Sequence, residues 1–535
     1  MQELIVKVKS FDLGAELINW WIGESPAAKH SFLAALIIGF VTNIFVYSSL
    51  IFGDHSIAMP RRTGHMVGAG RWIGEIAIQL SYSYLMPAII GIFATVSLAA
   101  VAFLFCKIFD IREKISAFLI ALIISTYPTV AIANVFQFTS ANVHLGAALA
   151  VLAVYLAKKY KYGFLIGAVL LMIAIAIYQT LLNVALVLSV MLLVFTIVSE
   201  RFNWKYLGNL SARLGLLIAG GGALYGISLP VSQFMTGITL TGYGGLSGDS
   251  MLSRMLSPRW LLDSFLSTSK YFFVNFDGAR FQVVPSMHMA YILFLIIALI
   301  LFMTVIINQR IYREPLRLSL LLLLTLLIPF ASNFATFFTE PGFRFSALMG
   351  LAFMLPMAFV VAGADNRSNI WGIFKSLMLV CVLFIGANHV IVNNVYYLKA
   401  YYANQRIISF AGRLAVEIDR LIPEVSSEEK DIVYFGGIPN EHYPAIDDPF
   451  SSTLQGHPLA NPHFLQMHND GRWQQNQFVA NLRNLHGVPV TLLSDDVKWV
   501  ELRKSVLDSD MPAWPSEGGI AIIDDVIVIN FGIEE

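Results

Sequence analysis

Long runs of apolar residues dominate the first 392 positions of the chain. A helix needs about 20 such residues to cross the hydrocarbon core of a membrane, and about eleven runs reach or approach that length. They lie near residues 31–52, 85–107, 116–134, 143–157, 164–178, 181–198, 212–233, 287–307, 317–337, 345–363 and 370–392. We therefore expect an all-α polytopic membrane region over residues 31–392, with about eleven transmembrane helices.

The pattern changes at about residue 393, where apolar and polar residues alternate over short stretches. Period-2 alternation predicts strands, and a turn between two such stretches predicts a hairpin around Asp524-Asp525. The predicted strands lie at 431–435, 488–493 and 520–531, and helical spacing is found at about 397–421 and 473–486. Residues 393–535 are thus predicted to form a separate α+β domain.

The first 30 residues carry neither the apolar core nor the cleavage site of a signal peptide. Residues 11–22, which include Trp20 and Trp21, have the pattern of an amphipathic helix that lies in the membrane interface. Residues 1–30 are therefore expected to form a cytoplasmic or interfacial N-terminal helix.

Lys and Arg residues are concentrated in every second connection along the chain, which predicts the orientation of the spans. One set of connections carries most of the cations, whereas the alternate connections near 135–142 and 179–180 carry none. The cationic set comprises Lys7, Lys9, Lys29, Lys107, Arg112, Lys114, Lys158, Lys159, Lys161, Arg201, Lys205, Arg213, Arg310, Arg313, Arg317, Arg367 and Lys375. We expect a cytoplasmic N-terminus and, after an odd number of spans, a C-terminal domain outside the membrane.

Composition agrees with a membrane protein and excludes a soluble one. Hydrophobic residues make up 57% and charged residues 13% of the 535 positions, against about 25% charged in soluble domains. Lys plus Arg equals Asp plus Glu at 35 each, so no polyanion such as a nucleic acid is an expected partner. This balance hides two opposite parts, because residues 1–392 hold 25 cations and 15 anions and the remainder holds 10 and 20.

Three segments on the expected outer side are too long to be simple connections. They cover residues 53–84, 234–286 and 393–535. Connections of such length are usually functional, so we searched them for chemistry. The two cysteines, Cys106 and Cys381, lie in apolar runs and offer neither a disulfide framework nor a metal site.

Asp54 stands at the outer end of the first span, beside His55 and close to three arginines. A carboxylate at a bilayer edge is unfavourable unless it is paired or functional. A single carboxylate near the cations Arg61, Arg62 and Arg71 suits a general base next to an anionic leaving group. The alternative is an aspartate that merely forms salt bridges within its loop.

Two further charged residues have competing explanations. Glu75 follows Arg71 by four residues, which favours a partner on the same short helix over a catalyst. Arg344 is the only cation in the short outer connection 338–344, against the charge bias of the chain. A lipid phosphate would account for it, since arginine presents a forked donor to phosphate; a pair with Glu340 is the alternative.

Polar residues elsewhere are less specific. Tyr178-Gln179 interrupts two apolar runs, and is either a tight turn satisfied by the amide or a contact to a substrate hydroxyl. His457, His463 and His468 match no standard metal spacing, and we predict no metal. His389, within a span, is explained by a polar contact between helices.

The layout resembles a GT-C glycosyltransferase, an enzyme class that takes sugars from polyprenyl-phosphate carriers. Gly53-Asp54-His55, Arg61-Arg62 and Gly70-Arg71-Trp72 are similar to the first outer loop of the bacterial and phage O-antigen glucosyltransferases of serotype conversion. The Tyr178-Gln179 turn and the loop from Pro341 to Arg344 also resemble that family. The sequence departs from it at His55, where a second aspartate is expected, and this leaves Asp54 as the only carboxylate of the pair.

The resemblance implies an inner-membrane enzyme that moves a hexose, such as glucose, from undecaprenyl-phosphate-sugar to a hydroxyl of O-antigen in the periplasm. Asp54 would act as the base, and Arg61, Arg62, Arg71 and Arg344 would hold the lipid phosphate. His55, Glu75, Tyr178 and Gln179 would contribute to substrate binding. Transfer would invert the anomeric carbon and require no cofactor.

Three alternatives remain at this point. The enzyme could act on lipid A or another envelope glycan instead of O-antigen. A transporter or flippase would be expected to show repeated halves and ionisable groups at mid-membrane. No internal repeat is evident, and the polar residues of the spans are mainly Asn and Gln, with His389 as the exception. A non-catalytic assembly factor for envelope polysaccharide would not need Asp54.

Overall fold

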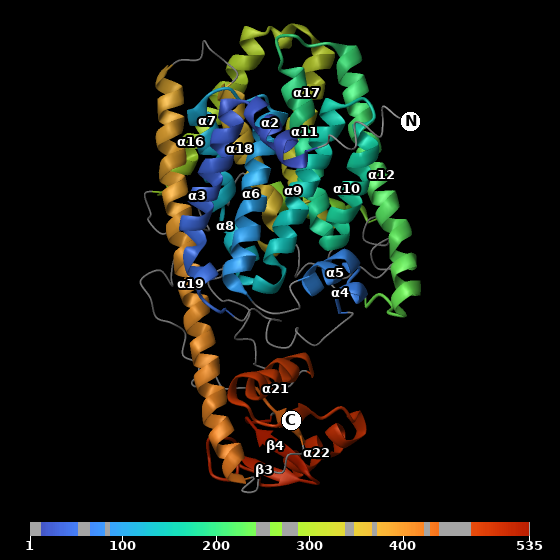
Figure 1. Cartoon of the computed structure of the whole chain (residues 1–535), viewed down its shortest axis with the longest axis vertical. Coiled ribbons are helices and arrows are strands. Elements are labelled where there is room, and N and C mark those ends of the chain that lie inside the picture. Colours follow the sequence, from blue (N-terminus) through green and yellow to red (C-terminus); the bar gives the residue numbers. More distant parts are fainter. Residues whose placement is uncertain are drawn as a thin grey trace.

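The computed structural model describes residues 12–51, 65–80, 86–241, 257–269, 287–337, 347–365, 372–421, 429–437 and 472–533. A bundle of helices makes up most of the molecule, and a small sheet domain lies below it on the end of one long helix (Figure 1). The end of the bundle nearer the sheet domain is called the tail-side end here, and the opposite end the far end.

Eight helices within the described ranges are long and apolar enough to cross a membrane. Each coincides with one of the apolar runs of the sequence, so the chain is a polytopic helical membrane protein. They are α3 (Pro26–Ser48), α6 (Pro87–Ile108), α9 (Gln137–Lys159), η2 with α11 (Gln179–Leu181 and Leu182–Ile197), α12 (Trp204–Thr236), α16 (Met287–Asn308), α17 (Pro315–Ser332) and α19 (Gly372–Leu421).

The other three expected spans are helical but shorter or broken. The run at 116–134 forms α7 (Lys114–Thr126) and α8 (Pro128–Val135), which meet at an angle of 42° and count as a ninth span if taken together. Proline has no N–H to continue a helix but suits a first turn, so Pro128 starts a new one. The remaining two are α10 (Gly163–Ile177) and the pair η8 (Ala347–Phe353) and α18 (Met354–Asp365), with 15, 7 and 12 residues.

Polar side chains inside the bundle are paired across helices. Tyr397 of α19 donates to Asn43 Oδ1 of α3 at 2.5 Å, and Asn134 of α8 accepts from Ser140 at 2.8 Å. His389 Nε2 lies 2.7 Å from the hydroxyl of Tyr291 on α16. This contact confirms the sequence-based explanation of His389 as a residue that joins two helices.

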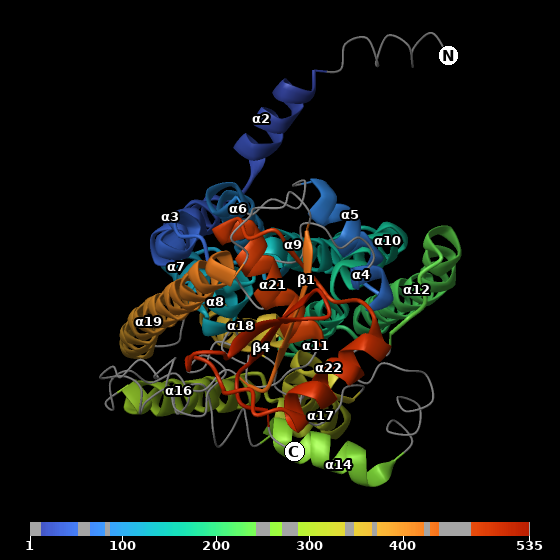
Figure 2. The same ribbon diagram turned by 90° about the horizontal axis from the view of Figure 1, so that it is seen from below.

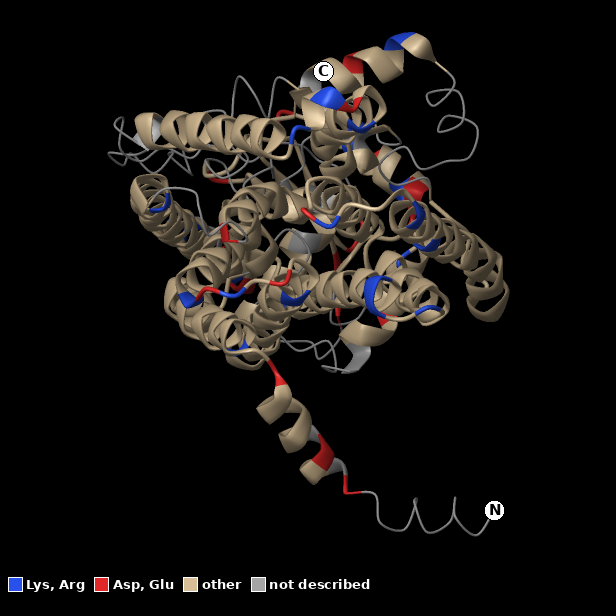
Figure 3. Ribbon diagram, turned by 90° about the horizontal axis from the view of Figure 1, so that it is seen from above, with Lys and Arg blue, Asp and Glu red and all other residues tan. Residues whose placement is uncertain are grey.

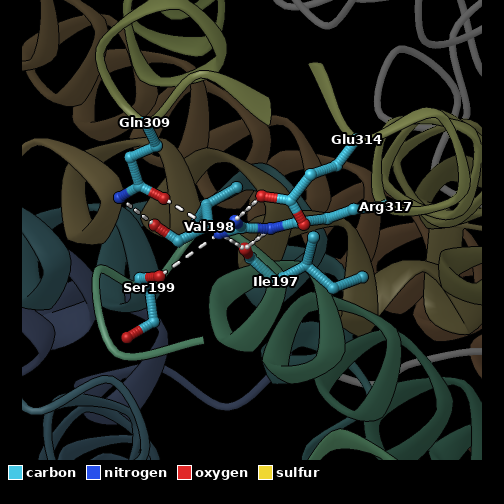
Figure 4. A network of polar contacts seen from close by, with 6 residues as sticks. All are labelled: Ile197, Val198, Ser199, Gln309, Glu314 and Arg317. Atoms are coloured by element: carbon cyan, nitrogen blue, oxygen red, sulfur yellow. Dashed lines mark hydrogen bonds and ion pairs between the residues drawn. The ribbon is translucent and has the colours of Figure 1, made fainter. Parts of the chain in front are cut away.

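Arg317 closes the far end of α11 (Figure 4). Its guanidinium donates to the carbonyl of Ile197 through Nη2 at 2.7 Å and Nε at 3.1 Å, and to Glu314 at 3.1 Å. Beside it, Gln309 Nε2 donates to the carbonyl of Val198 at 2.6 Å. A cation that binds the last carbonyls of a helix satisfies groups which have no partner within the helix.

Replacing Arg317 by methionine should therefore destabilise the fold by about 3 kcal/mol, because buried carbonyls lose a charged donor. The midpoint of thermal unfolding in detergent measures this. Arg313→Met is the matched control, since Arg313 is exposed one turn earlier and should leave the midpoint unchanged. An unchanged midpoint for Arg317→Met would show that the capping contributes nothing.

The helix α19 joins the bundle to the sheet domain. Its 50 residues span about 75 Å, far more than a hydrocarbon core of about 30 Å, and its lower part extends beyond the bundle (Figure 1). The boundary expected at residue 393 falls inside this helix. The last expected span and the first expected helix of the tail are therefore one element.

The sheet domain contains the strands that alternation predicted. They are β1 (Lys430–Phe435), β2 (Val490–Leu492), β3 (Ile520–Ile523) and β4 (Val526–Asn530), in the order β2-β1-β4-β3. β1 is parallel to β2 and β4, whereas β3 and β4 form the expected hairpin, with Ile522 opposite Ile527.

Helices cover both faces of this sheet. Tyr434 and Ile529 pack toward α19 and α21 (Arg472–His486), whereas Val433 and Val528 pack toward α22 (Asp496–Asp508). Alternate residues of a strand point to opposite faces, which explains the division. The helix α22 was not predicted from the sequence.

The expected N-terminal helix is present as α2 (Leu13–Gly23). Asp12 caps its start, because its carboxylate accepts from the N–H groups of Gly14 and Ala15. The helix projects sideways from the bundle (Figure 2), and Trp21 stacks on Phe103 of α6. Seen from above, most of the ribbon carries neither Lys, Arg, Asp nor Glu (Figure 3).

Candidate functional site

A short helical hairpin lies at the tail-side end of the bundle, formed by α4 (His65–Gly68) and α5 (Trp72–Leu80) (Figure 1). Gly70 makes the turn with a φ of +74°, a conformation that favours glycine. The amide of Arg71 donates back to the carbonyl of Met66 at 2.7 Å. Glu75 Oε2 accepts from the N–H of Met66 at 3.3 Å, so this carboxylate helps to hold the hairpin.

Arg71 points from this hairpin to the turn at Tyr178-Gln179, 108 residues later. Its Nε donates to Gln179 Oε1 at 3.1 Å, and its guanidinium lies 4.4 Å from the centroid of the Tyr178 ring. A guanidinium over an aromatic face is held electrostatically and by contact. The structure thus joins four of the candidate residues, Arg71, Glu75, Tyr178 and Gln179, around one short hairpin.

Further contacts fix the hairpin against α12. Gln179 Nε2 donates to the carbonyl of Ala69 at 2.6 Å, and the Tyr225 hydroxyl donates to the carbonyl of Gly70 at 3.0 Å. Trp72 Nε1 donates to the hydroxyl of Ser228 at 3.1 Å. Tyr225 and Ser228 were missed from the sequence, where their only signal is two polar groups one turn apart in an otherwise apolar run.

The ends of the other long segments are also tied to this region. Thr241, within the second long segment (234–286), donates through its amide to the carbonyl of Gly68 at 2.9 Å. Asn183 Oδ1 accepts from the N–H of Ala335 in η6 (Phe334–Phe337) at 3.2 Å. Asn333 donates to Thr268 of α14 (Pro258–Ser269) at 3.2 Å.

Interrupted helices meet at the same level. The 3₁₀ segments η2, η6 and η8 contact one another or the broken span α7–α8. Irregular backbone at membrane depth is tolerated where it is buried in protein or lines a cavity, and broken helices mark the substrate sites of many membrane proteins. This end of the bundle is therefore the best candidate for the functional site.

The remaining candidate residues, Asp54, His55, Arg61, Arg62 and Arg344, lie outside the described residues. The chain leading to the first four is described up to Ile51, whose amide donates to Gln137 Oε1 at 3.4 Å. No group of three or more potential metal ligands occurs within the described ranges; His457, His463 and His468 lie outside them.

Replacing Gly70 by alanine should reduce activity at least tenfold. A Cβ there would lie 2.9 Å from the Tyr225 hydroxyl and 3.0 Å from Gln179 Nε2, and the left-handed conformation itself costs about 1–2 kcal/mol with a side chain. Both effects would move Arg71. Initial rates of the sugar transfer that the resemblance implies measure the loss, and wild-type rates would contradict it.

Gly208→Ala is the control. Gly208 lies in α12, and a Cβ added there would have no neighbouring atom within 4 Å. Alanine favours a helix over glycine, so this variant should keep wild-type rates.

A polytopic helical bundle in which interrupted helices and buried irregular backbone meet at one end is typical of membrane proteins with a substrate site there. The family model described as glucosyl transferase GtrII matches residues 43–357, more than half of the chain. The chain belongs to this family and is therefore a glucosyltransferase of the type that modifies O-antigen in serotype conversion. Comparisons with curated proteins and with solved structures gave no match.

The family match covers the α4–α5 hairpin, Tyr178-Gln179 and the region of Tyr225 and Ser228, but not α19 or the sheet domain. It also removes the two non-enzymatic alternatives, the transporter and the assembly factor.

Proposed function

We propose that this enzyme moves glucose from undecaprenyl-phosphate-glucose to a hydroxyl group of O-antigen, with inversion at the anomeric carbon. The enzyme lies in the bacterial inner membrane with its N-terminus in the cytoplasm. Residues 31–392 form the catalytic membrane domain of GT-C type. The tail-side end and the domain at 393–535 face the periplasm, where the segments 53–84 and 234–286 build the site.

The main observation in support of this proposal is the fixed orientation of Arg71. Its Nε bonds to Gln179 and its face lies on Tyr178, so these two contacts orient the guanidinium. An oriented arginine is suited to a phosphate group, because its planar fork matches two phosphate oxygens. A lipid monophosphate is the leaving group that such a residue would stabilise.

The proposed reaction needs one base and one anion site. The Asp54 carboxylate takes the proton of the acceptor hydroxyl as its oxygen attacks the anomeric carbon. The bond between that carbon and the phosphate oxygen breaks, and its electron pair leaves with undecaprenyl phosphate. Arg61, Arg62, Arg71 and Arg344 would stabilise the charge that develops on this phosphate, so neither a metal nor a redox cofactor is required.

Charge distribution supports the proposed orientation. The far end carries Lys107, Lys158 and Arg213, among other cations, at the ends of α6 and α9 and near the start of α12. Cytoplasmic connections of membrane proteins are enriched in Lys and Arg. The tail-side end would then be periplasmic, on the side where O-antigen is modified.

A donor panel tests the proposal. Purified enzyme in detergent is mixed with lipid-linked O-antigen and with undecaprenyl-phosphate-glucose, another undecaprenyl-phosphate-hexose or UDP-glucose. We expect glucosylated product only with the lipid-phosphate glucose. Transfer from UDP-glucose alone would exclude the proposed donor, and glucosylation of lipid A in place of O-antigen would exclude the proposed acceptor.

A further inference from the structure

Two glutamines, one buried and one half-buried, hold the chain on either side of residues 52–64. The first is Gln137, the first residue of α9, which is 2% exposed. Its Nε2 donates to the carbonyls of Val46 and Ser49, each at 2.8 Å, and its Oε1 accepts from the N–H of Ile51. One side chain thus closes the end of α3 and fixes the chain that leaves it.

The second is Gln179, in the turn between α10 and α11. Its Nε2 donates to the carbonyl of Ala69 at 2.6 Å and to the Tyr225 hydroxyl at 3.3 Å, while its Oε1 accepts from Arg71. The contacts therefore fix the chain where it continues after residues 52–64, on the turn of the α4–α5 hairpin.

Both amides are used by the protein itself. A glutamine has two N–H donors, and the two donors of each glutamine are directed to protein oxygens at these distances. A direct bond from Gln179 Nε2 to a substrate hydroxyl would need one of these bonds to break. Gln179 is therefore better suited to orient Arg71 than to bind sugar.

We propose that Gln137 and Gln179 are positioning residues for glucosyl transfer, acting through Ile51 and Arg71 respectively. Asp54 follows Ile51 by three residues, and Arg71 is the described phosphate-binding candidate. A misplacement of about 1 Å between reacting groups can reduce a rate by about 100-fold, so fixed ends on both sides of this segment would matter for catalysis. This inference rests on the proposed function.

The far end of the bundle supplies a matched comparison. Gln309 makes the same pair of contacts there: its Nε2 donates to the carbonyl of Val198 at 2.6 Å, and its Oε1 accepts from Arg317 at 3.2 Å (Figure 4). Substituting Gln309 removes the same kinds of bonds as substituting Gln179, at the opposite end of the bundle from the proposed site.

The test compares Gln137→Met, Gln179→Met and Gln309→Met, since methionine keeps the length of glutamine but none of its hydrogen bonds. We expect Gln137→Met to lower kcat at least tenfold, with the donor KM little changed. Gln179→Met should raise the donor KM about tenfold or more, because Arg71 loses its orientation. Gln309→Met should keep both constants, whatever its effect on thermal stability.

Two additional variants separate positioning from folding. In the Arg71→Ala background, Gln179→Met should add no further increase in donor KM, because the two residues act as one unit. If Gln137→Met does not fold, Gln137→Asn, which keeps the amide but shortens the side chain by one methylene, replaces it in the comparison.

Asp54→Asn and Arg71→Ala are measured in parallel to distinguish the two ideas. If both keep wild-type kinetics, the proposed function fails and this inference falls with it. If both are impaired while Gln137→Met and Gln179→Met behave like Gln309→Met, the proposed function stands and the positioning role is wrong. A full additional loss from Gln179→Met in the Arg71→Ala background would also overturn the assignment to Arg71.

Discussion

Asp54→Asn is expected to lower kcat by at least 100-fold while the protein stays folded. Asparagine has the shape of aspartate but cannot take a proton from the acceptor hydroxyl, and general base catalysis contributes about 100- to 10,000-fold. Because substrate binding does not need this proton transfer, the donor KM should change little. Initial rates with saturating donor and acceptor measure the effect.

The control for this variant is Asp110→Asn. Asp110 pairs with Lys158 at 2.8 Å at the far end of the bundle, so its loss should leave kcat unchanged. Full transfer by Asp54→Asn would show that another group accepts the proton. His55→Ala then becomes informative, because His55 occupies the position where the resembled family is expected to carry a second aspartate.

Replacing Arg71 or Arg344 by alanine should raise the donor KM by about 10- to 100-fold. A hydrogen bond to a charged group contributes about 1.5–3 kcal/mol, which corresponds to that range. Arg71→Lys should recover only part of the loss, since lysine has no Nε to bond to Gln179 and no planar fork. Competition by undecaprenyl phosphate gives an independent measure of phosphate binding.

An unchanged donor KM for Arg344→Ala would remove that residue from the site and favour its pairing with Glu340. The same result for Arg71→Ala would be more damaging, because the orientation of Arg71 is the observation on which the proposal depends. Asp54 would then remain as the candidate base, but no residue that the structure describes would remain as a candidate for the phosphate site.

The membrane bundle could be predicted well from the sequence, because apolar runs of about 20 residues have few alternatives to a helix in a membrane. Every run coincides with helical residues. The count of long helices was less predictable. Pro128 divides one run into α7 and α8 although the apolar composition continues across it, whereas the short α10 matches the short run 164–178.

The sheet domain shows the same contrast. Alternation in residues 431–435 and 520–531 predicted β1, β3 and β4, because successive side chains of a strand point to opposite faces of the sheet. The helix α22 was missed because only Leu502 and Val506 of its residues are buried, which gives a weak helical pattern. Strand order and parallel pairing depend on contacts between distant residues and left no local signal.

For the candidate site, residue types were predictable but their partners were not. Arg71 and Gln179 were separate candidates, and a bond across 108 residues cannot be read from spacing. Glu75 was expected to pair with Arg71 along one helix, and this stays a prediction; its carboxylate accepts from the N–H of Met66. Gln137 was overlooked, because a single amide at a helix start has many ordinary explanations.

The central claim is tested most directly by following the anomeric carbon of glucose during transfer. Purified enzyme is given undecaprenyl-phosphate-[1-¹³C]glucose and lipid-linked O-antigen, and the one-bond carbon–proton coupling of the donor and product is read by NMR. The account predicts wild-type product with the anomeric configuration opposite to that of the donor, and no product with Asp54→Asn. A product of retained configuration, or equal product from both proteins, would contradict it.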